Sequence, residues 1–266
     1  MRHIVLGAVA ALALAGAASA ETVAGREAIV HVPAHPAPAG ARALVVVLHG
    51  GLGNAEHIED GRAESALNLD SEAEAHGFVV AYLNGTPVTR FSQRMLGWNA
   101  GGGCCGQSAR SGADDVAYLR AAVDQLAREY GVDPRRVYAI GHSNGAMMAQ
   151  RMMCETRVFA AAVAVSGPLN LPVDSCPAAR GARILAIHGD ADRNVPVDGG
   201  RGPMGLSGVS FASEARSQAV FTRSGATYDL RVLPGAPHWL VDIDADLKRR
   251  DGRSLQATAV RFFGLD

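Results

Sequence analysis

Residues 136–148 read Arg-Val-Tyr-Ala-Ile-Gly-His-Ser-Asn-Gly-Ala-Met-Met. The first five residues are typical of a buried strand, and residues 146–154 are typical of a helix. Between them, Gly141, Ser143 and Gly145 form a G-x-S-x-G pattern. This pattern is weak alone, because glycine and serine are common, but between a strand and a helix it predicts a sharp turn. Such a turn holds the Ser143 hydroxyl at a helix N-terminus, where the helix dipole favours negative charge. An ordinary turn serine is the alternative.

Strands and helices alternate along the rest of the chain. Apolar runs that end at glycine or polar residues predict strands at 43–48, 78–83, 136–140, 160–165, 183–187 and 228–233. Helical spacing predicts helices at 63–75, 111–130, 146–154, 213–223 and 247–263. This alternation indicates an α/β protein with a mostly parallel central sheet and helices on both faces. We expect 33–41 to be a surface loop and 86–110 to be a long functional loop.

The N-terminal residues 1–20 combine a basic start, a short apolar run and a small-residue cleavage site. This pattern predicts a secretory signal peptide. The apolar run is shorter than the ~20 residues that span a bilayer, although a signal anchor is the alternative. Residues 21–266 fit one domain. We therefore predict a secreted protein, extracellular or periplasmic, without stable membrane insertion.

The composition excludes some partners. The chain has 266 residues, of which 48% are hydrophobic, and a formal net charge of −1. The hydrophobic content allows a sizeable core. We see no basic patch of the kind that neutralises phosphates, so no nucleic-acid partner is expected. The oligomeric state stays open.

Four cysteines remain in the predicted mature chain, namely Cys104, Cys105, Cys154 and Cys176. An even number of cysteines in an exported chain suggests disulfides. Of the three possible connectivities we favour Cys154–Cys176, because adjacent cysteines bridge only with strain. Cys104 and Cys105 would then form a vicinal disulfide or remain two thiols. The spacing is not that of a zinc site, so no metal is predicted.

A serine hydroxyl is a poor nucleophile unless a base takes its proton. In the order Ser, acid, His, only His188 and His238 follow Ser143. His238 lies between the last predicted strand and helix, which favours it as the base, and His188 becomes a buried structural residue. Asp192 is favoured as the acid over Asp190, because the segment matches an H-G-x-x-D-x-x-V-P turn. Asp190 would hold the loop through backbone amides.

An oxyanion formed at Ser143 needs hydrogen-bond donors. The backbone N–H of Asn144 is one predicted donor, and Gly50 or Gly51, after the strand at 43–48, is the second. Glycine lets the backbone turn its N–H groups into a site. The alternative is that residues 49–51 are only a turn.

Three further residues are candidates for substrate binding. Trp98 and Trp239 fall in loops near the expected site, where they would either line a pocket or simply pack the loops. His49 precedes the glycine pair and is included with them. The methionines that follow Ser143 favour the core over the pocket.

The whole pattern resembles the secreted polyhydroxybutyrate depolymerase and feruloyl esterase group of α/β-hydrolases. The matching segments are Leu-His-Gly-Gly at 48–51, Gly-Trp-Asn-Ala-Gly at 97–101, Cys-Cys-Gly at 104–106, and residues 114–119, 132–138 and 141–148, with those around Asp192 and His238. The resemblance covers 27–263 and is most specific over 97–148. It implies an α/β-hydrolase fold without metal or organic cofactor, and a triad of Ser143, Asp192 and His238.

The resemblance also implies the reaction. Such proteins cleave ester bonds in polyesters, or feruloyl and acetyl esters on plant polysaccharide. Residues 197–212 have no match in the pattern, so soluble oligomers and small esters stay open as substrates beside polymers. The remaining alternatives are a serine peptidase on the same fold, a non-catalytic secreted binding protein, and a redox protein that uses thiols at Cys104 and Cys105.

Overall fold

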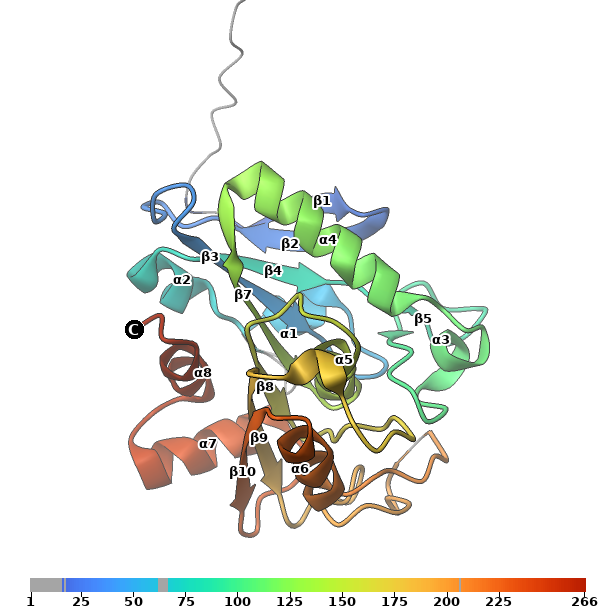
Figure 1. Cartoon of the computed structure of the whole chain (residues 1–266). Helices are drawn as coiled ribbons and strands as arrows, with labels where there is room; N and C mark the ends of the chain where they lie inside the picture. Colours follow the sequence, from blue (N-terminus) through green and yellow to red (C-terminus); the bar gives the residue numbers. More distant parts are fainter. Residues whose placement is uncertain (1–15, 17, 62–66, 206) are drawn as a thin grey trace, which may run out of the picture.

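A central sheet runs through the computed structural model, which describes residues 16, 18–61, 67–205 and 207–266 (Figure 1). In spatial order, the eight described strands of this sheet are β1 (Ala18–Val23), β2 (Arg26–His31), β4 (Val79–Leu83), β3 (Arg42–Leu48), β7 (Val132–His142), β8 (Ala161–Val165), β9 (Arg183–Gly189) and β10 (Thr227–Leu233). From β4 to β10 in this order all neighbours pair in parallel. Only β1 and β2, at one edge, pair antiparallel. The prediction of a mostly parallel sheet is confirmed.

Helices cover both faces of the sheet, as predicted. One face carries α4 (Asp115–Tyr130), α5 (Asn144–Glu155) and α6 (Glu214–Arg223), and the other carries α2 (Asp70–His76), α7 (Leu240–Asp251) and α8 (Leu255–Phe263) (Figure 1). Strand β3 shows the reason, because successive side chains of a strand point to opposite faces. Leu44, Val46 and Leu48 pack with the first set of helices, and Val45 and Val47 with the second. A strand buried on both sides needs a continuous apolar run.

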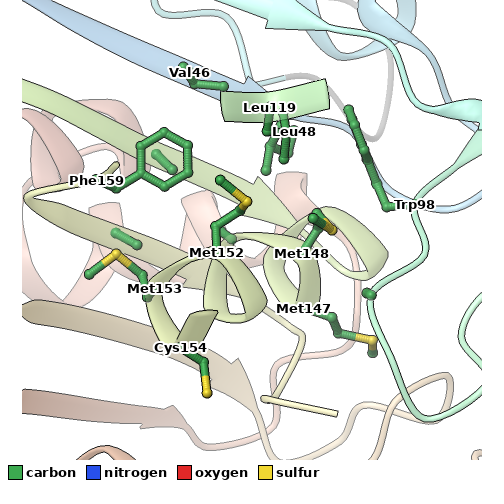
Figure 2. Packing of buried hydrophobic residues seen from close by; sticks show 14 of the residues in the cluster. Val46, Leu48, Trp98, Leu119, Met147, Met148, Met152, Met153, Cys154 and Phe159 are labelled. Atoms are coloured by element: carbon green, nitrogen blue, oxygen red, sulfur yellow. The ribbon is translucent and has the colours of Figure 1, made fainter. Parts of the chain in front are cut away.

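Helix α5 carries a row of methionines into the core (Figure 2). Met148, Met152 and Met153 are at most 2% exposed and pack in the same cluster as Phe159. Unbranched thioether side chains fill irregular gaps of this kind. The prediction that these methionines are core residues is confirmed. Met147 is also buried, but in addition it lines the cavity described below.

The single closing helix predicted at 247–263 is wrong. The structure has two helices there, α7 and α8, and α7 already begins at Leu240. Gly252 ends α7 in the left-handed conformation, with φ of 67°, which glycine adopts without steric cost. Ser254 then begins α8, since its hydroxyl accepts a hydrogen bond from the N–H of Ala257.

Other boundaries also differ from prediction. The loop predicted at 86–110 contains a short ribbon of β5 (Thr86–Pro87) and β6 (Leu96–Gly97) and the helix α3 (Gly106–Arg110). Helix α4 is capped by Asp114 rather than opened at Ser111. Two short elements, α1 (Ala55–Glu59) and η1 (Pro177–Ala179), were not predicted. Of the helix predicted at 63–75, the structure shows α2 from Asp70 to His76, and residues 62–66 lie outside the described part. The surface loop at 33–41 does connect β2 and β3.

All four cysteines are paired. Cys154, near the end of α5, is bonded to Cys176, which confirms the favoured pairing. Cys104 is bonded to Cys105, so no free thiol is present among the described residues. A redox protein that needs a titratable thiol at this pair therefore receives no support.

The predicted signal peptide at 1–20 falls mostly outside the described residues, which begin at Gly16 and continue from Ala18. Its last residues belong to β1, which pairs with β2 from Ala18 to Val23. Export therefore stays a prediction. Within the described part of the chain, no helix is both long and apolar enough to cross a membrane.

Removal of the disulfide between Cys154 and Cys176 should lower the stability of the protein. It closes a loop with a sequence separation of 22 residues. We expect the double variant Cys154→Ser, Cys176→Ser to lose about 3 kcal/mol of unfolding free energy, because the unfolded chain is no longer constrained. Urea unfolding followed by circular dichroism measures the change, and each single serine variant should lose a similar free energy, because it also lacks the bond. An unchanged unfolding midpoint in the double variant would contradict the pairing.

Candidate active site

The turn between β7 and α5 is strained at Ser143. Its backbone angles are φ 54° and ψ −119°, in a region that residues with a side chain rarely adopt. A Cβ on Gly145 would collide with the carbonyl oxygens of Leu48 and His49, and one on Gly141 with the backbone of Gly145. The two glycines of the G-x-S-x-G pattern are therefore required by close backbone packing.

The carboxyl ends of β7, β9 and β10 bring three predicted site residues together. The Nε2 atom of His238, in the loop after β10, lies 3.0 Å from the Ser143 hydroxyl oxygen. The Nδ1 atom of His238 lies 2.6 Å from a carboxylate oxygen of Asp192, in the turn after β9. Since the carboxylate accepts, Nδ1 carries the proton and Nε2 is left to accept the Ser143 O–H. His238 and Asp192 are buried, and Ser143 is half-buried.

Asp192 is held as an anion. Burial by itself would raise its pKa, but the hydrogen bonds from His188 and His238 outweigh burial and hold the pKa of Asp192 well below its usual range. Its second oxygen accepts the backbone N–H groups of Asn194 and Val195, both at 2.8 Å. These bonds also fix the orientation of the carboxylate.

Asp190, the acid that was not favoured, has a different surrounding. Its side chain is exposed and accepts the backbone N–H of Gly235 at 2.6 Å. This contact joins the turn after β9 to the loop before His238. A bond to a backbone amide is what the sequence analysis expects for Asp190.

Unpaired backbone N–H groups lie beside Ser143. A Cβ on Gly50 would stand 3.5 Å from the Ser143 Cβ, and one on Gly51 would stand 3.7 Å from the Asn144 Cβ. Neither Gly50 nor Gly51 donates a backbone hydrogen bond within the described residues. The N–H of Asn144 is the first of helix α5, where no intrahelical acceptor exists.

His49, a predicted substrate-binding residue, has both of its ring nitrogens in hydrogen bonds with the main chain. Its Nδ1–H donates to the carbonyl of Gly50 at 2.8 Å, and its Nε2 accepts the N–H of Gly85 at 3.0 Å. Burial lowers the pKa of His49 to about 4, so the ring is neutral. Although His49 lines the cavity, both ring nitrogens are occupied, and the side chain holds the Gly50 loop in place.

Trp98 does not have the predicted role in substrate binding, because it is fully buried and does not line the cavity. Its indole N–H donates to the carbonyl of His49 at 3.0 Å. Its backbone N–H and carbonyl both bond to the Asn144 side-chain amide, at 2.6 and 3.0 Å. Trp98 belongs to the same cluster of buried side chains as Leu48 and Met148 (Figure 2). The side chain thus packs the loops around Ser143 and does not wall a substrate pocket.

A cavity of about 720 Å³ opens over Ser143. Apolar side chains form much of its wall, namely Leu52, Ile58, Val88, Met147, Val195, Met204, Phe211 and Trp239. Trp239 is 41% exposed, and its ring meets that of His238 edge-on at 5.5 Å. Arg110 is the one Arg or Lys among the described lining residues, which include no carboxylate.

Several residues of the site were not anticipated from the sequence. His142 donates its Nε2–H to the carbonyl of His238 at 2.9 Å, and burial lowers the pKa of His142 to about 3. Met204 and Phe211 line the cavity from the glycine-rich segment that the resemblance does not cover. No periodic signal in the sequence marks these positions, because they come from tertiary packing.

Known proteins are similar to this chain in sequence and in fold. The family model described as the prolyl oligopeptidase family matches residues 73–176, less than half of the chain, including the turn at Ser143. The solved structure of an acetyl xylan esterase from Aspergillus awamori superposes with a TM-score of 0.58 at 16% identity, over 94% of this chain and 100% of that one. The chain has the α/β-hydrolase fold.

Two curated relatives are similar in sequence to this chain. The NocK protein of Nocardia uniformis subsp. tsuyamanensis, provisionally named an esterase, is 39% identical over 168 residues, or 63% of this chain and 45% of NocK. Feruloyl esterase B of Piromyces equi is 31% identical over 184 residues, or 66% of this chain and 31% of that protein. The chain thus spans less than half the length of each of these relatives.

The packing around the turn at Ser143 predicts that alanine destabilises the protein at one glycine and not at another. Gly145→Ala should lower the unfolding free energy by about 3 kcal/mol, because the new methyl group has no room beside two carbonyl oxygens. Gly51→Ala is the matched control, since its methyl group would meet nothing closer than 3.7 Å. Thermal unfolding followed by circular dichroism compares them. Equal melting temperatures for the two variants would contradict the packing described for the turn.

Proposed function

We propose that this protein is a serine esterase that hydrolyses carboxylic esters through an acyl-enzyme. The observation that carries the proposal is the hydrogen-bonded series from Ser143 through His238 to Asp192, next to unpaired backbone N–H groups. A nucleophile with a base, an acid that orients the base, and donors for an oxyanion are the parts that acyl transfer requires. The apolar cavity above Ser143 offers room for the ester.

In the proposed reaction, His238 takes the proton of Ser143 as the hydroxyl oxygen attacks the ester carbonyl. The N–H of Asn144 and that of Gly50 or Gly51 receive the oxyanion. The alcohol leaves with a proton from His238, and an acyl-enzyme remains. His238 then activates a water molecule, which releases the acid. Asp192 stays ionised and stabilises the imidazolium.

Two substrate classes remain for this esterase. Relatives are named as a feruloyl esterase and as a bifunctional acetylxylan esterase and xylanase, which supports esters carried by plant polysaccharide. The sequence resemblance supports polyhydroxybutyrate or its soluble oligomers equally. Export through the predicted signal peptide at 1–20 would be compatible with either class.

A serine peptidase is the second candidate, because the prolyl oligopeptidase family model matches 73–176. The same three side chains would serve amide cleavage. The cavity argues against substrates with a free amino terminus, since its described lining includes no carboxylate to receive an ammonium group. The relatives that are named as esterases favour esters over peptides as substrates.

The first test is hydrolysis of p-nitrophenyl esters of increasing acyl length and of methyl ferulate by the wild type and Ser143→Ala. We expect the variant to lose kcat/KM at least about 10⁴-fold, because the nucleophile is gone. Comparing kcat/KM for methyl ferulate with kcat/KM for the aliphatic esters ranks the two substrate classes. A proline-containing peptide p-nitroanilide tests the peptidase alternative. Equal ester hydrolysis by both proteins, or none by either, would rule out the proposed mechanism.

The charge of the cavity predicts a preference within the esters. Arg110 lies at the end of α3, exposed and without an ion pair or hydrogen bond among the described residues. We expect Arg110→Gln to lower kcat/KM by about 2- to 5-fold for mono-p-nitrophenyl glutarate, whose acyl group ends in a carboxylate, and not for p-nitrophenyl pentanoate. Arg120→Gln, on the exposed side of α4 away from the cavity, is the control. The same loss on both esters would remove the charge explanation.

A further inference from the structure

A second buried group of polar side chains lies behind Asp192, away from Ser143. It consists of His188 at the end of β9, Glu214 at the start of α6 and Tyr228 on β10. The His188 and Glu214 residues are fully buried, and Tyr228 is 6% exposed. The reaction proposed above uses none of the three. Buried polar groups of this kind are costly unless they are paired, so their arrangement calls for an explanation.

His188 bridges two carboxylates. Its Nε2 lies 3.1 Å from the same Asp192 oxygen that receives His238, and 2.8 Å from the carbonyl oxygen of Val195. Its Nδ1 lies 2.8 Å from one oxygen of Glu214. The other oxygen of Glu214 accepts the Tyr228 hydroxyl at 2.6 Å. One continuous series of hydrogen bonds thus leads from Tyr228 to His238.

The partners define where the protons are. The Val195 carbonyl can only accept a hydrogen bond, so Nε2 of His188 carries a proton. Glu214 already accepts the Tyr228 hydroxyl, and as a carboxylate it also accepts from Nδ1, which makes the ring an imidazolium. Burial by itself would lower the pKa of His188, but the hydrogen bonds to Asp192 and Glu214 outweigh burial and raise the pKa to about 9. The group therefore holds one cation between two anions.

We propose that His188, held by Glu214, is a positioning residue that keeps a positive charge against Asp192 and thereby sets the pH range in which His238 acts as the base. The inference rests on the proposed esterase function. Asp192 stabilises a proton on His238, and a second cation hydrogen-bonded to the same oxygen of Asp192 weakens that stabilisation. His238 therefore gives up its proton at a lower pH than it would beside an isolated carboxylate, and it stays available as a base.

The surroundings contain the other groups that bear on this charge. Asp192 faces His188 from the turn after β9, Glu214 from α6, and Tyr228 contributes through Glu214 from β10. The imidazoles of His142, on β7, and His238 lie beyond Asp192. Burial keeps His142 neutral by lowering its pKa to about 3, so His142 adds no positive charge beside Asp192 at neutral pH.

The pH dependence of kcat/KM tests the proposal. The double variant His188→Gln, Glu214→Gln removes one cation and one anion, so the net charge of the buried group is unchanged. Without the cation, the imidazolium of His238 is more stable and forms at higher pH. We expect the midpoint of the acidic limb to rise by about one pH unit on a p-nitrophenyl ester. Tyr228→Phe is the control, because it keeps both His188 and Glu214, and it should not raise the midpoint.

Loss of activity at every pH with an unmoved midpoint would overturn the proposal and leave His188 a purely structural residue. A second measurement does not depend on activity. In Ser143→Ala, nitrogen-15 NMR of the histidine rings at pH 7.5 should show both nitrogens of His188 protonated, and one unprotonated nitrogen would equally overturn the proposal. If the wild type hydrolyses no ester, the proposed function fails while the NMR result still reports on His188.

Discussion

The backbone of Gly145 passes so close to the carbonyl oxygens of Leu48 and His49 that no Cβ fits there. This approach holds the first turn of α5 against the end of β3. Because β3 continues directly into the glycine loop, the same contact sets unpaired N–H groups beside Ser143. The positive φ of Ser143 costs about 1–3 kcal/mol, and the rigid packing of α5 onto the sheet maintains it. The Ser143 hydroxyl and the proposed oxyanion donors are thus arranged by one backbone contact.

The side chains that support the site are in turn held by the main chain. His142 is bonded to the carbonyl of His238, Asn144 to the backbone of Trp98, and Asp192 to two amides of its own turn. Backbone partners do not change rotamer, so each group of the proposed site is positioned before a substrate arrives. Such preorganisation is what makes hydrogen-bond donors and charges effective in a transition state. His188 extends this arrangement by one step, with a side chain that carries charge.

Local pattern was enough to predict the alternating strands and helices, the turn at Ser143 and the chain order that leads to His238. These features repeat along the chain or follow from the spacing of a few residues. The break at Gly252 was missed because apolar positions continue through it at helical spacing. For Trp98 a pocket wall and loop packing both stayed open, because sequence shows that an aromatic residue lies in a loop, but not which way the loop turns. Glu214 gave no signal, since a glutamate in the first turn of a helix is ordinarily exposed.

The sequence pattern predicts some groups of the site and misses others. This division corresponds to the chemical roles proposed for the groups. The groups proposed to carry the reaction sit at strand ends, where an α/β-hydrolase sheet allows few arrangements. The groups that would choose a substrate sit elsewhere: Arg110 ends a five-residue helix, and Met204 and Phe211 come from a glycine-rich segment without periodicity. Loops of this kind vary without disturbing the sheet, because few core contacts depend on them. The proposed reaction can therefore be kept at the sheet edge while the surrounding loops change which ester the cavity accepts.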